Sequence, residues 1–177
     1  MSDRLTELRV ENRRLKEQVQ DLENKVLSLV GMISLESSGG TDRNNYYNDK
    51  IINFIHSTEE QINIVTPKID KFYTTELKKT AERGIPILII TGDRRTIPKE
   101  YIPYYEELKT IDKVSIVTNP NVNYLMLFNS QEAFYSGGSL DQKELEKSVL
   151  IITTIKEQAK LKKIANIFTL MLPSFMR

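Results

Sequence analysis

A seven-residue repeat of apolar side chains at the start of the sequence constrains the fold more than any other feature. Leucine recurs at every seventh position in one row, and a mostly β-branched row alternates with it at steps of three and four residues. Such rows are the a and d positions of a left-handed coiled coil. The seam consists of Leu5, Leu8, Asn12, Leu15, Val19, Leu22, Val26, Leu29 and Ile33.

The residue types of this seam favour a parallel dimer. β-Branched residues at a and leucine at d pack well between two strands, and a buried Asn12 can pair with its copy, which fixes the strand number. The alternative is one amphipathic helix packed on its own domain, but a stripe two positions wide per heptad is narrower than such a helix needs. We predict a homodimeric coiled coil over residues 1–36, a linker over 37–44 that contains Ser37-Ser38-Gly39-Gly40, and an α/β domain over 45–177.

Composition excludes several classes of protein. The chain of 177 residues has a formal net charge of +1, which implies no overall attraction to nucleic acid or membrane. It has no cysteine and one histidine, so it offers no disulfide and no usual metal-ligand spacing. Its first residues are polar, and no apolar run approaches the roughly 20 residues of a membrane span. We expect a cytoplasmic protein with no metal, cofactor or membrane span.

Strand and helix patterns alternate beyond residue 44. The continuous apolar run at 85–90 is typical of a central strand covered on both faces. Asn129-Ser130-Gln131 indicates a hairpin turn. This order predicts an α/β sandwich around a mixed sheet. The expected helices lie at 45–57, 74–83, 104–110 and 155–172, with one more between the last two strands, and the expected strands lie at 61–66, 85–90, 113–118, 124–129, 132–136 and 148–154.

From about residue 45 to residue 172 the chain resembles the phospholipase D-like domain. That family's signature is His-x-Lys, four residues, Asp, six residues and Gly-Ser-x-Asn. The segment Gly138-Ser139-Leu140-Asp141 matches its last part, with Asp in place of Asn, and 146–152 resembles the strand that follows. Counting back at the family spacing puts Tyr124 at the His, Met126 at the Lys and Gln131 at the Asp.

The resemblance implies the family's scaffold without its chemistry. In the family the His is the nucleophile and the Lys holds the phosphate, whereas tyrosine has a pKa near 10 and methionine carries no charge. We therefore expect no catalytic residues and no enzymatic activity. With its coil, the chain is similar to the effector half of archaeal TrmB-type transcriptional regulators. Those carry a winged helix ahead of the coil, and this sequence shows none, which weakens the case for DNA binding.

Two segments are candidate sites for an anion or another ligand. Arg94 and Arg95 follow a central strand, where α/β sheets usually keep their sites, and guanidinium groups can hold phosphate or carboxylate bidentately. Gly138, Ser139 and Asp141 follow the hairpin, where backbone N–H groups can cradle an anion. The alternatives are a solvated loop in the first case and a tight turn that requires positive φ in the second.

Three functions remain open at this point. We expect a non-catalytic dimeric regulatory protein whose α/β domain binds a protein partner or an effector, with transcription as one setting. The second is a nucleic-acid-binding factor. The third is an enzyme with relocated phosphate chemistry at Asp93, Arg94 and Asp141, which rests on fold analogy. The second would need a local basic patch formed by Lys68, Lys71, Lys78, Lys79, Arg83, Arg94 and Arg95.

Overall fold

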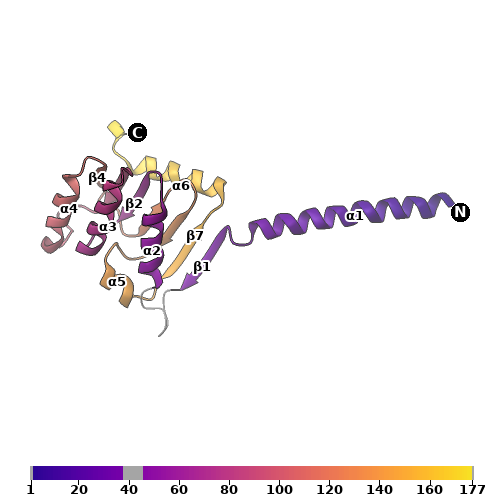
Figure 1. Ribbon diagram of the computed structural model, residues 1–177, viewed down its shortest axis with the longest axis horizontal. Coiled ribbons are helices and arrows are strands. Elements are labelled where there is room, and N and C mark those ends of the chain that lie inside the picture. The colour runs from indigo at the N-terminus through magenta and orange to yellow at the C-terminus, as the bar shows by residue number, and fades with distance from the viewer. Residues whose placement is uncertain (1, 38–45, 177) are drawn as a thin grey trace.

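A computed structural model describes residues 2–37 and 46–176, as an α/β domain from which one long helix projects (Figure 1). The predicted linker at 37–44 lies outside the described residues, apart from Ser37. Within these ranges no helix is both long and apolar enough to cross a membrane.

The projecting helix, α1 (Ser2–Leu29), carries the heptad pattern on its surface. Five residues of the predicted seam are 52–62% exposed, so the domain of the same chain does not cover them. The side chains of Leu5 and Leu29 lie outside the described part of the helix. The exposed seam residues are Leu8, Leu15, Val19, Leu22 and Val26.

The strand β1 (Ile33–Ser37) follows this helix directly and belongs to the sheet. Gly31 turns the chain with a φ of 97°, a conformation that favours glycine, and β1 then pairs antiparallel with β7 (Ile151–Ile155). The predicted coil boundary after residue 36 therefore differs from the structure, because 33–37 is a strand. Ile33-Ser34-Leu35-Glu36-Ser37 alternates apolar and polar residues, which is the period of a strand.

The sheet has seven strands in the order β1-β7-β6-β5-β2-β3-β4. Three neighbouring strands are parallel, and the others pair antiparallel, so the predicted mixed sheet is confirmed. The parallel strands are β2 (Ile62–Thr66), β3 (Ile87–Thr91) and β4 (Val114–Thr118), and the remaining strands are β5 (Leu125–Phe128) and β6 (Ala133–Ser136).

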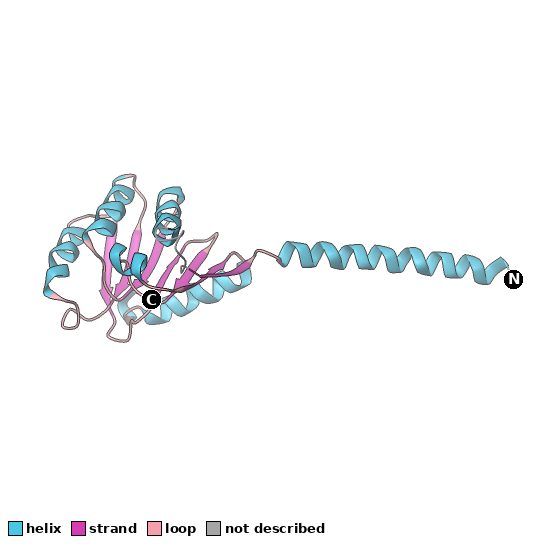
Figure 2. Cartoon of the chain, turned by 90° about the horizontal axis from the view of Figure 1, so that it is seen from below, coloured by secondary structure: helices cyan, strands magenta, loops and turns pink. Residues whose placement is uncertain are grey.

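Helices cover the two faces of this sheet unequally (Figure 2). One face carries α2 (Tyr46–Ser57), α3 (Lys71–Glu82), α4 (Ile102–Lys109) and the short α5 (Gln142–Lys147). The other carries α6 (Gln158–Met171), and 3-10 turns lie at Lys99–Tyr101 and Ser174–Met176. The first α3 turn begins earlier than the predicted residue 74, because Asp70 caps it by accepting the Tyr73 N–H.

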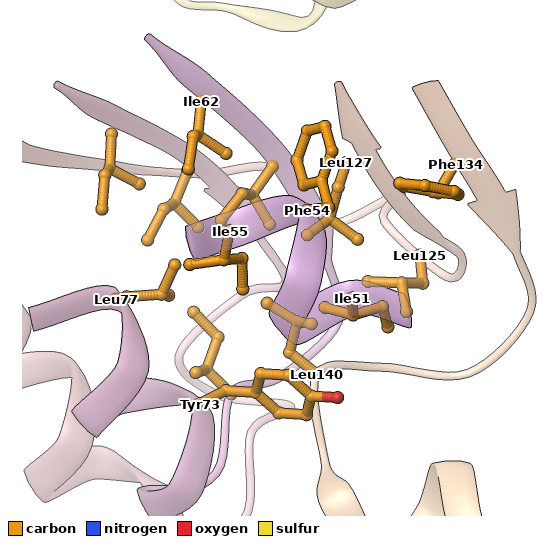
Figure 3. Packing of buried hydrophobic residues seen from close by; sticks show 14 of the residues in the cluster. Ile51, Phe54, Ile55, Ile62, Tyr73, Leu77, Leu125, Leu127, Phe134 and Leu140 are labelled. Atoms are coloured by element: carbon orange, nitrogen blue, oxygen red, sulfur yellow. The ribbon is translucent and has the colours of Figure 1, made fainter. Parts of the chain in front are cut away.

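Each face has its own apolar core. On the four-helix face, Ile51 and Phe54 of α2 and Leu77 of α3 pack against alternate residues of the central strands (Figure 3). On the α6 face, Leu161 and Phe168 pack with Met126 and Phe128 of β5. Strands buried on both faces explain the continuous apolar runs in the sequence.

Candidate functional site

A cleft lies at the edge of the sheet where β2 and β3 end, β5 begins and β6 ends. Parallel strands present their carboxyl ends at one edge, which is where open α/β sheets usually bind ligands. The cleft has a volume of about 430 Å³, and we name it the Lys68 cleft. Its walls include Pro67, Lys68, Gly92, Thr96, Asn123, Gly138, Ser139 and Glu144.

Hydrogen bonds join the segment after β2 to the Gly-Ser segment after β6. The buried Thr66 hydroxyl donates to the Lys68 carbonyl at 2.8 Å and accepts the Leu140 N–H at 2.9 Å. The Asp70 N–H donates to the Leu140 carbonyl at 2.8 Å. These contacts hold Lys68 beside a segment that is far away in the sequence.

Side chains of both signs meet in this cleft. Lys68 Nζ lies 2.9 Å from Glu144 Oε2 and 3.4 Å from Asp141 Oδ2. The Ser139 hydroxyl donates to the same Glu144 oxygen at 2.8 Å. Tyr101 donates its hydroxyl to Asp141, and its ring centroid is 4.9 Å from Lys68 Nζ. The cleft therefore holds a hydroxyl, a carboxylate and a cation in direct contact.

The pKa shifts fix the charge of each group at neutral pH. Burial opposes the charge of Lys68, but the hydrogen bond and charge of Glu144, together with Asp141, raise the pKa of Lys68 above its usual value. Burial likewise opposes ionisation of Asp141, but the Tyr101 hydroxyl, the Glu144 N–H and Lys68 hold the pKa of Asp141 below its usual value. The bond to Asp141 raises the pKa of Tyr101. Lys68 is a cation, Asp141 an anion and Tyr101 a neutral phenol.

Two residues of the Gly-Ser segment have local structural roles. Gly138 adopts a φ of 80°, so the predicted tight turn is present, and a side chain there would be strained. Asp141 is the N-cap of α5 and accepts the Glu144 N–H at 3.0 Å. The turn and the cap together place Ser139 and Glu144 side by side.

The predicted candidate residues do not form one site. Gly138 and Ser139 line the Lys68 cleft, and Asp141 borders it from the side of Tyr101. Arg95 instead pairs with Asp93 at 2.6 Å, and Arg94 pairs with Glu106. Arg94 lines a separate hollow beside β4. Binding of an anion by these arginines stays a prediction, in which the ligand would have to displace the carboxylates.

Sequence reasoning considered Lys68 only as part of a basic patch, and it did not single out Glu144. The Thr66-Pro67-Lys68 segment carries a usable signal, because it ends a buried strand with a hydroxyl, a helix breaker and a cation. For Glu144 the only signal is its place three residues after a capping Asp, where a side chain returns toward the cap.

The two residues aligned with the family's His and Lys lie on the α6 side of the sheet. Met126 is buried in the α6 core, and the Tyr124 hydroxyl donates to Met171 Sδ at 3.3 Å. His56, the one histidine, pairs with Glu76 at 2.6 Å between α2 and α3. In the part of the chain that the structure describes, no group of three or more His, Cys, Asp or Glu residues could hold a metal ion.

Solved structures with the same fold include members of the phospholipase D family. NucT from Helicobacter pylori superposes with a TM-score of 0.67 at 14% identity, over 78% of this chain and 95% of that one. Nuc from Salmonella typhimurium, a phospholipase D family member, gives a TM-score of 0.65 at 10% identity, over 78% and 92%. No family model matches this sequence. No curated protein matches it either.

A third structure matches more of the chain. TrmBL2, an archaeal chromatin protein with a novel mode of DNA binding, gives a TM-score of 0.56 at 14% identity, over 95% of this chain and 63% of that one. A match over 95% of the chain cannot leave out α1. The fold of this chain is phospholipase D-like, and its likeness to TrmBL2 extends into the projecting helix.

The expectation that this chain is not an enzyme is contradicted by these neighbours. NucT and Nuc share the fold, and the phospholipase D family is a family of enzymes, so the fold points to enzymes. A single altered motif does not establish that a scaffold lacks catalytic groups. Tyr124 and Met126 stand where the family has its nucleophilic His and its phosphate-binding Lys. Other residues of the same scaffold can still act as nucleophiles.

Proposed function

We propose that this chain is a homodimeric regulatory protein that acts on nucleic acid, with α1 joining two copies and the α/β domain making the other contacts. The observation that carries the proposal is the likeness to TrmBL2, because it includes α1 as well as the domain. TrmBL2 is a chromatin protein that binds DNA, and its match to this chain spans both the helix and the domain.

The exposed seam of α1 supports pairing with a second copy. A helix with an apolar stripe more than half exposed gains free energy by covering it, and the a and d spacing fits a second identical helix. Asn12 lies in the middle of this stripe, where it can meet its own copy in a parallel dimer.

The test of assembly is the mass of the chain in solution, measured by light scattering. Leu22→Asp would bury a charge in the seam, so the proposed dimer should become a monomer whose domain stays folded. Asn12→Val should strengthen the coil while relaxing its strand number. Val10→Asp is the control, since Val10 is exposed and outside the seam. A wild-type monomer would overturn the proposal.

Nucleic-acid contact would have to come from cations that are free to reach phosphate. Most of the basic residues named from the sequence bond within the chain, as Lys78 does to Glu107 and Arg83 does to the His56 carbonyl. In contrast, α6 presents Lys160, Lys162 and Lys163 exposed in three of four consecutive positions. We therefore assign the phosphate contacts to α6.

The matching experiment is a salt titration of binding to duplex DNA. Neutralising a phosphate contact weakens binding to all sequences and lowers the slope of log K against log salt by about one. A triple Lys→Ala variant at 160, 162 and 163 should lower that slope by about two to three per copy. Lys78→Ala is the matched control. Absence of salt-dependent binding in the wild type would refute nucleic-acid binding.

A second candidate function is favoured by the Ser139–Glu144–Lys68 contacts. A hydroxyl that donates to a carboxylate is the arrangement of a nucleophile and its base, and Lys68 could stabilise developing negative charge. Hydrolysis of bis(4-nitrophenyl) phosphate should then be lost in Ser139→Ala and kept in Tyr124→Phe. Loss in Tyr124→Phe with Ser139→Ala active would place the chemistry at the family's motif position instead.

A further inference from the structure

The α6 face of the sheet is well covered at its centre and open at one corner. Along one row of paired positions, 6% of Met126 of β5 is exposed, 46% of Tyr135 of β6 and 71% of Leu35 of β1, with the partly buried Thr153 of β7 between the last two. Ile151, at the first position of β7, is 68% exposed. We call Tyr135, Ile151 and Leu35 the open corner.

The path of α6 explains why this corner is bare. The helix starts just after β7, where the Lys156 N–H donates to the Met32 carbonyl at 2.6 Å. It then runs under the sheet, and its buried residues Leu161 and Phe168 pack with β5 and the strands beyond (Figure 2). Its C-terminal extension reaches β4 through Phe175. Only the first turn of α6 lies near β1 and β7. The rest of that end of the sheet is therefore not covered by the helix.

The chemistry of the open corner is that of an interface. None of the residues that face this side on β1, β7 and β6 carries a charge, although charges commonly protect an exposed sheet edge. Tyr135 packs on Tyr124 with ring centroids 5.5 Å apart, and tyrosines are enriched where proteins meet. The residues facing this side are Ile33, Leu35, Ser37, Ala133, Tyr135, Ile151, Thr153 and Ile155.

The chain path singles out the occupant. Only three residues separate the end of α1 from β1, and one of them, Val30, is 71% exposed and apolar. In a parallel coil the twofold axis runs between the two helices, which are about 8–10 Å apart, so segments that directly follow the coil stay near the axis. Exposed apolar residues thus continue from the seam through Val30 and Ile33 to Leu35 of the open corner.

We infer that the open corner packs against the open corner of a second copy, as a second dimer contact continuous with the α1 coil. The inference rests on the proposed dimer and adds the sheet to it. Identical uncharged surfaces meet across a twofold axis without like-charge repulsion. Nucleic acid does not fit this surface, because the surface offers no cationic side chain to contact phosphate.

Thiol crosslinking tests the contact in the full chain, which has no natural cysteine to interfere. Leu35→Cys should form a covalent dimer with a short bifunctional maleimide. Leu22→Cys in the coil seam should do so as well. Phe175→Cys should not, because Phe175 is 84% exposed but lies beside β4 at the far side of the sheet. The wild type is the blank.

The pattern of products separates this inference from the proposed coil. Crosslinking at both Leu22 and Leu35 supports both contacts, and crosslinking at Leu22 alone overturns the sheet contact while the coil stands. Crosslinking at Leu35 alone keeps the sheet contact and removes the coil. No product at either position overturns both. Efficient crosslinking at Phe175 as well would show random collision, and it too would overturn the inference.

An affinity measurement gives the second readout. Leu35→Glu places a charge in the contact and should raise the dimer dissociation constant roughly tenfold or more, whereas Phe175→Glu should leave it unchanged. Leu35 is exposed in the single chain, so the melting temperature of a dissociated Leu35→Glu sample should match that of a dissociated wild type. Equal dissociation constants for all three chains would refute the contact.

Discussion

Asp141 joins three parts of the molecule through one carboxylate. It caps α5, accepts the Tyr101 hydroxyl and lies beside Lys68. Loss of a capping side chain costs about 0.5–2 kcal/mol, and hydrogen bonds to a charged group add to that cost. We expect Asp141→Ala to lower the free energy of unfolding by about 2 kcal/mol or more at pH 7, measured by urea denaturation. Asp112→Asn, at an exposed position, should change it little.

The pH dependence of this effect follows from the sign of the shift. The pKa of Asp141 is depressed in the folded chain, so its stabilisation is complete above the unfolded value of about 3.9 and is lost as pH falls through the lower folded value. Asp141→Asn keeps a capping side chain but no charge. The stability difference between wild type and Asp141→Asn should therefore shrink below about pH 4. A difference that grew in acid would contradict the assigned charge state.

At the scale of single residues, the sequence reveals roles that neighbouring residues determine. It does not reveal contacts between residues that are far apart in the chain. The segment around Gly138 and Asp141 could be recognised because turns and caps are set by neighbouring residues. The contact of Lys68 with Glu144 joins positions on different elements, and only the fold brings them together. The same limit applies to Arg94, whose partner Glu106 lies on α4.

Among the elements, β1 is held by α2 as well as by its ladder with β7. Glu36 accepts the Tyr46 hydroxyl at 2.7 Å and lies 2.9 Å from Lys50 Nζ, and the bond from Tyr46 is the main cause of its lowered pKa. Glu36→Ala should cost about 1 kcal/mol, since the pair is partly exposed. Amide hydrogen exchange should quicken in β1 and stay unchanged in β2 and β3.

The matched control for this prediction is Glu59→Ala, which removes an exposed carboxylate elsewhere. Equal exchange rates in β1 for Glu36→Ala and Glu59→Ala would show that the contacts of Glu36 add nothing to the ladder with β7. The backbone ladder has five paired positions, so either outcome measures how much the α2 contact adds.

Elements with strong patterns could be predicted, and β1 could not. The buried runs that became β2 and β3 are long enough to stand out by composition alone. In contrast, Ile33 also fits the a position of the heptad. The heptad pattern therefore assigned it to the coil, although it lies in a strand. Competition between a period of 3.5 and a period of 2 cannot be resolved over five residues.

For the whole molecule, the position of β1 decides where the chain can be cut. Removal of residues 1–29 deletes α1 and leaves the seven-stranded sheet intact. Removal of residues 1–37 also deletes β1 and bares the edge of β7, with its unpaired backbone groups. We expect the shorter chain to melt at a lower temperature and to aggregate more, as measured by calorimetry and light scattering. Identical melting curves would mean that β1 adds nothing to the domain.

The pairing of β1 with β7 also sets an order of events during synthesis. The ribosome releases α1 and β1 early, but their place in the sheet exists only once β7, near the other end of the chain, has been made. Pairing across so long a loop is entropically slow. In that interval the proposed pairing of α1 requires only another α1, and two nascent chains on neighbouring ribosomes can supply each other. Choice of partner would then precede completion of the fold, so that copies from one messenger RNA would pair with each other.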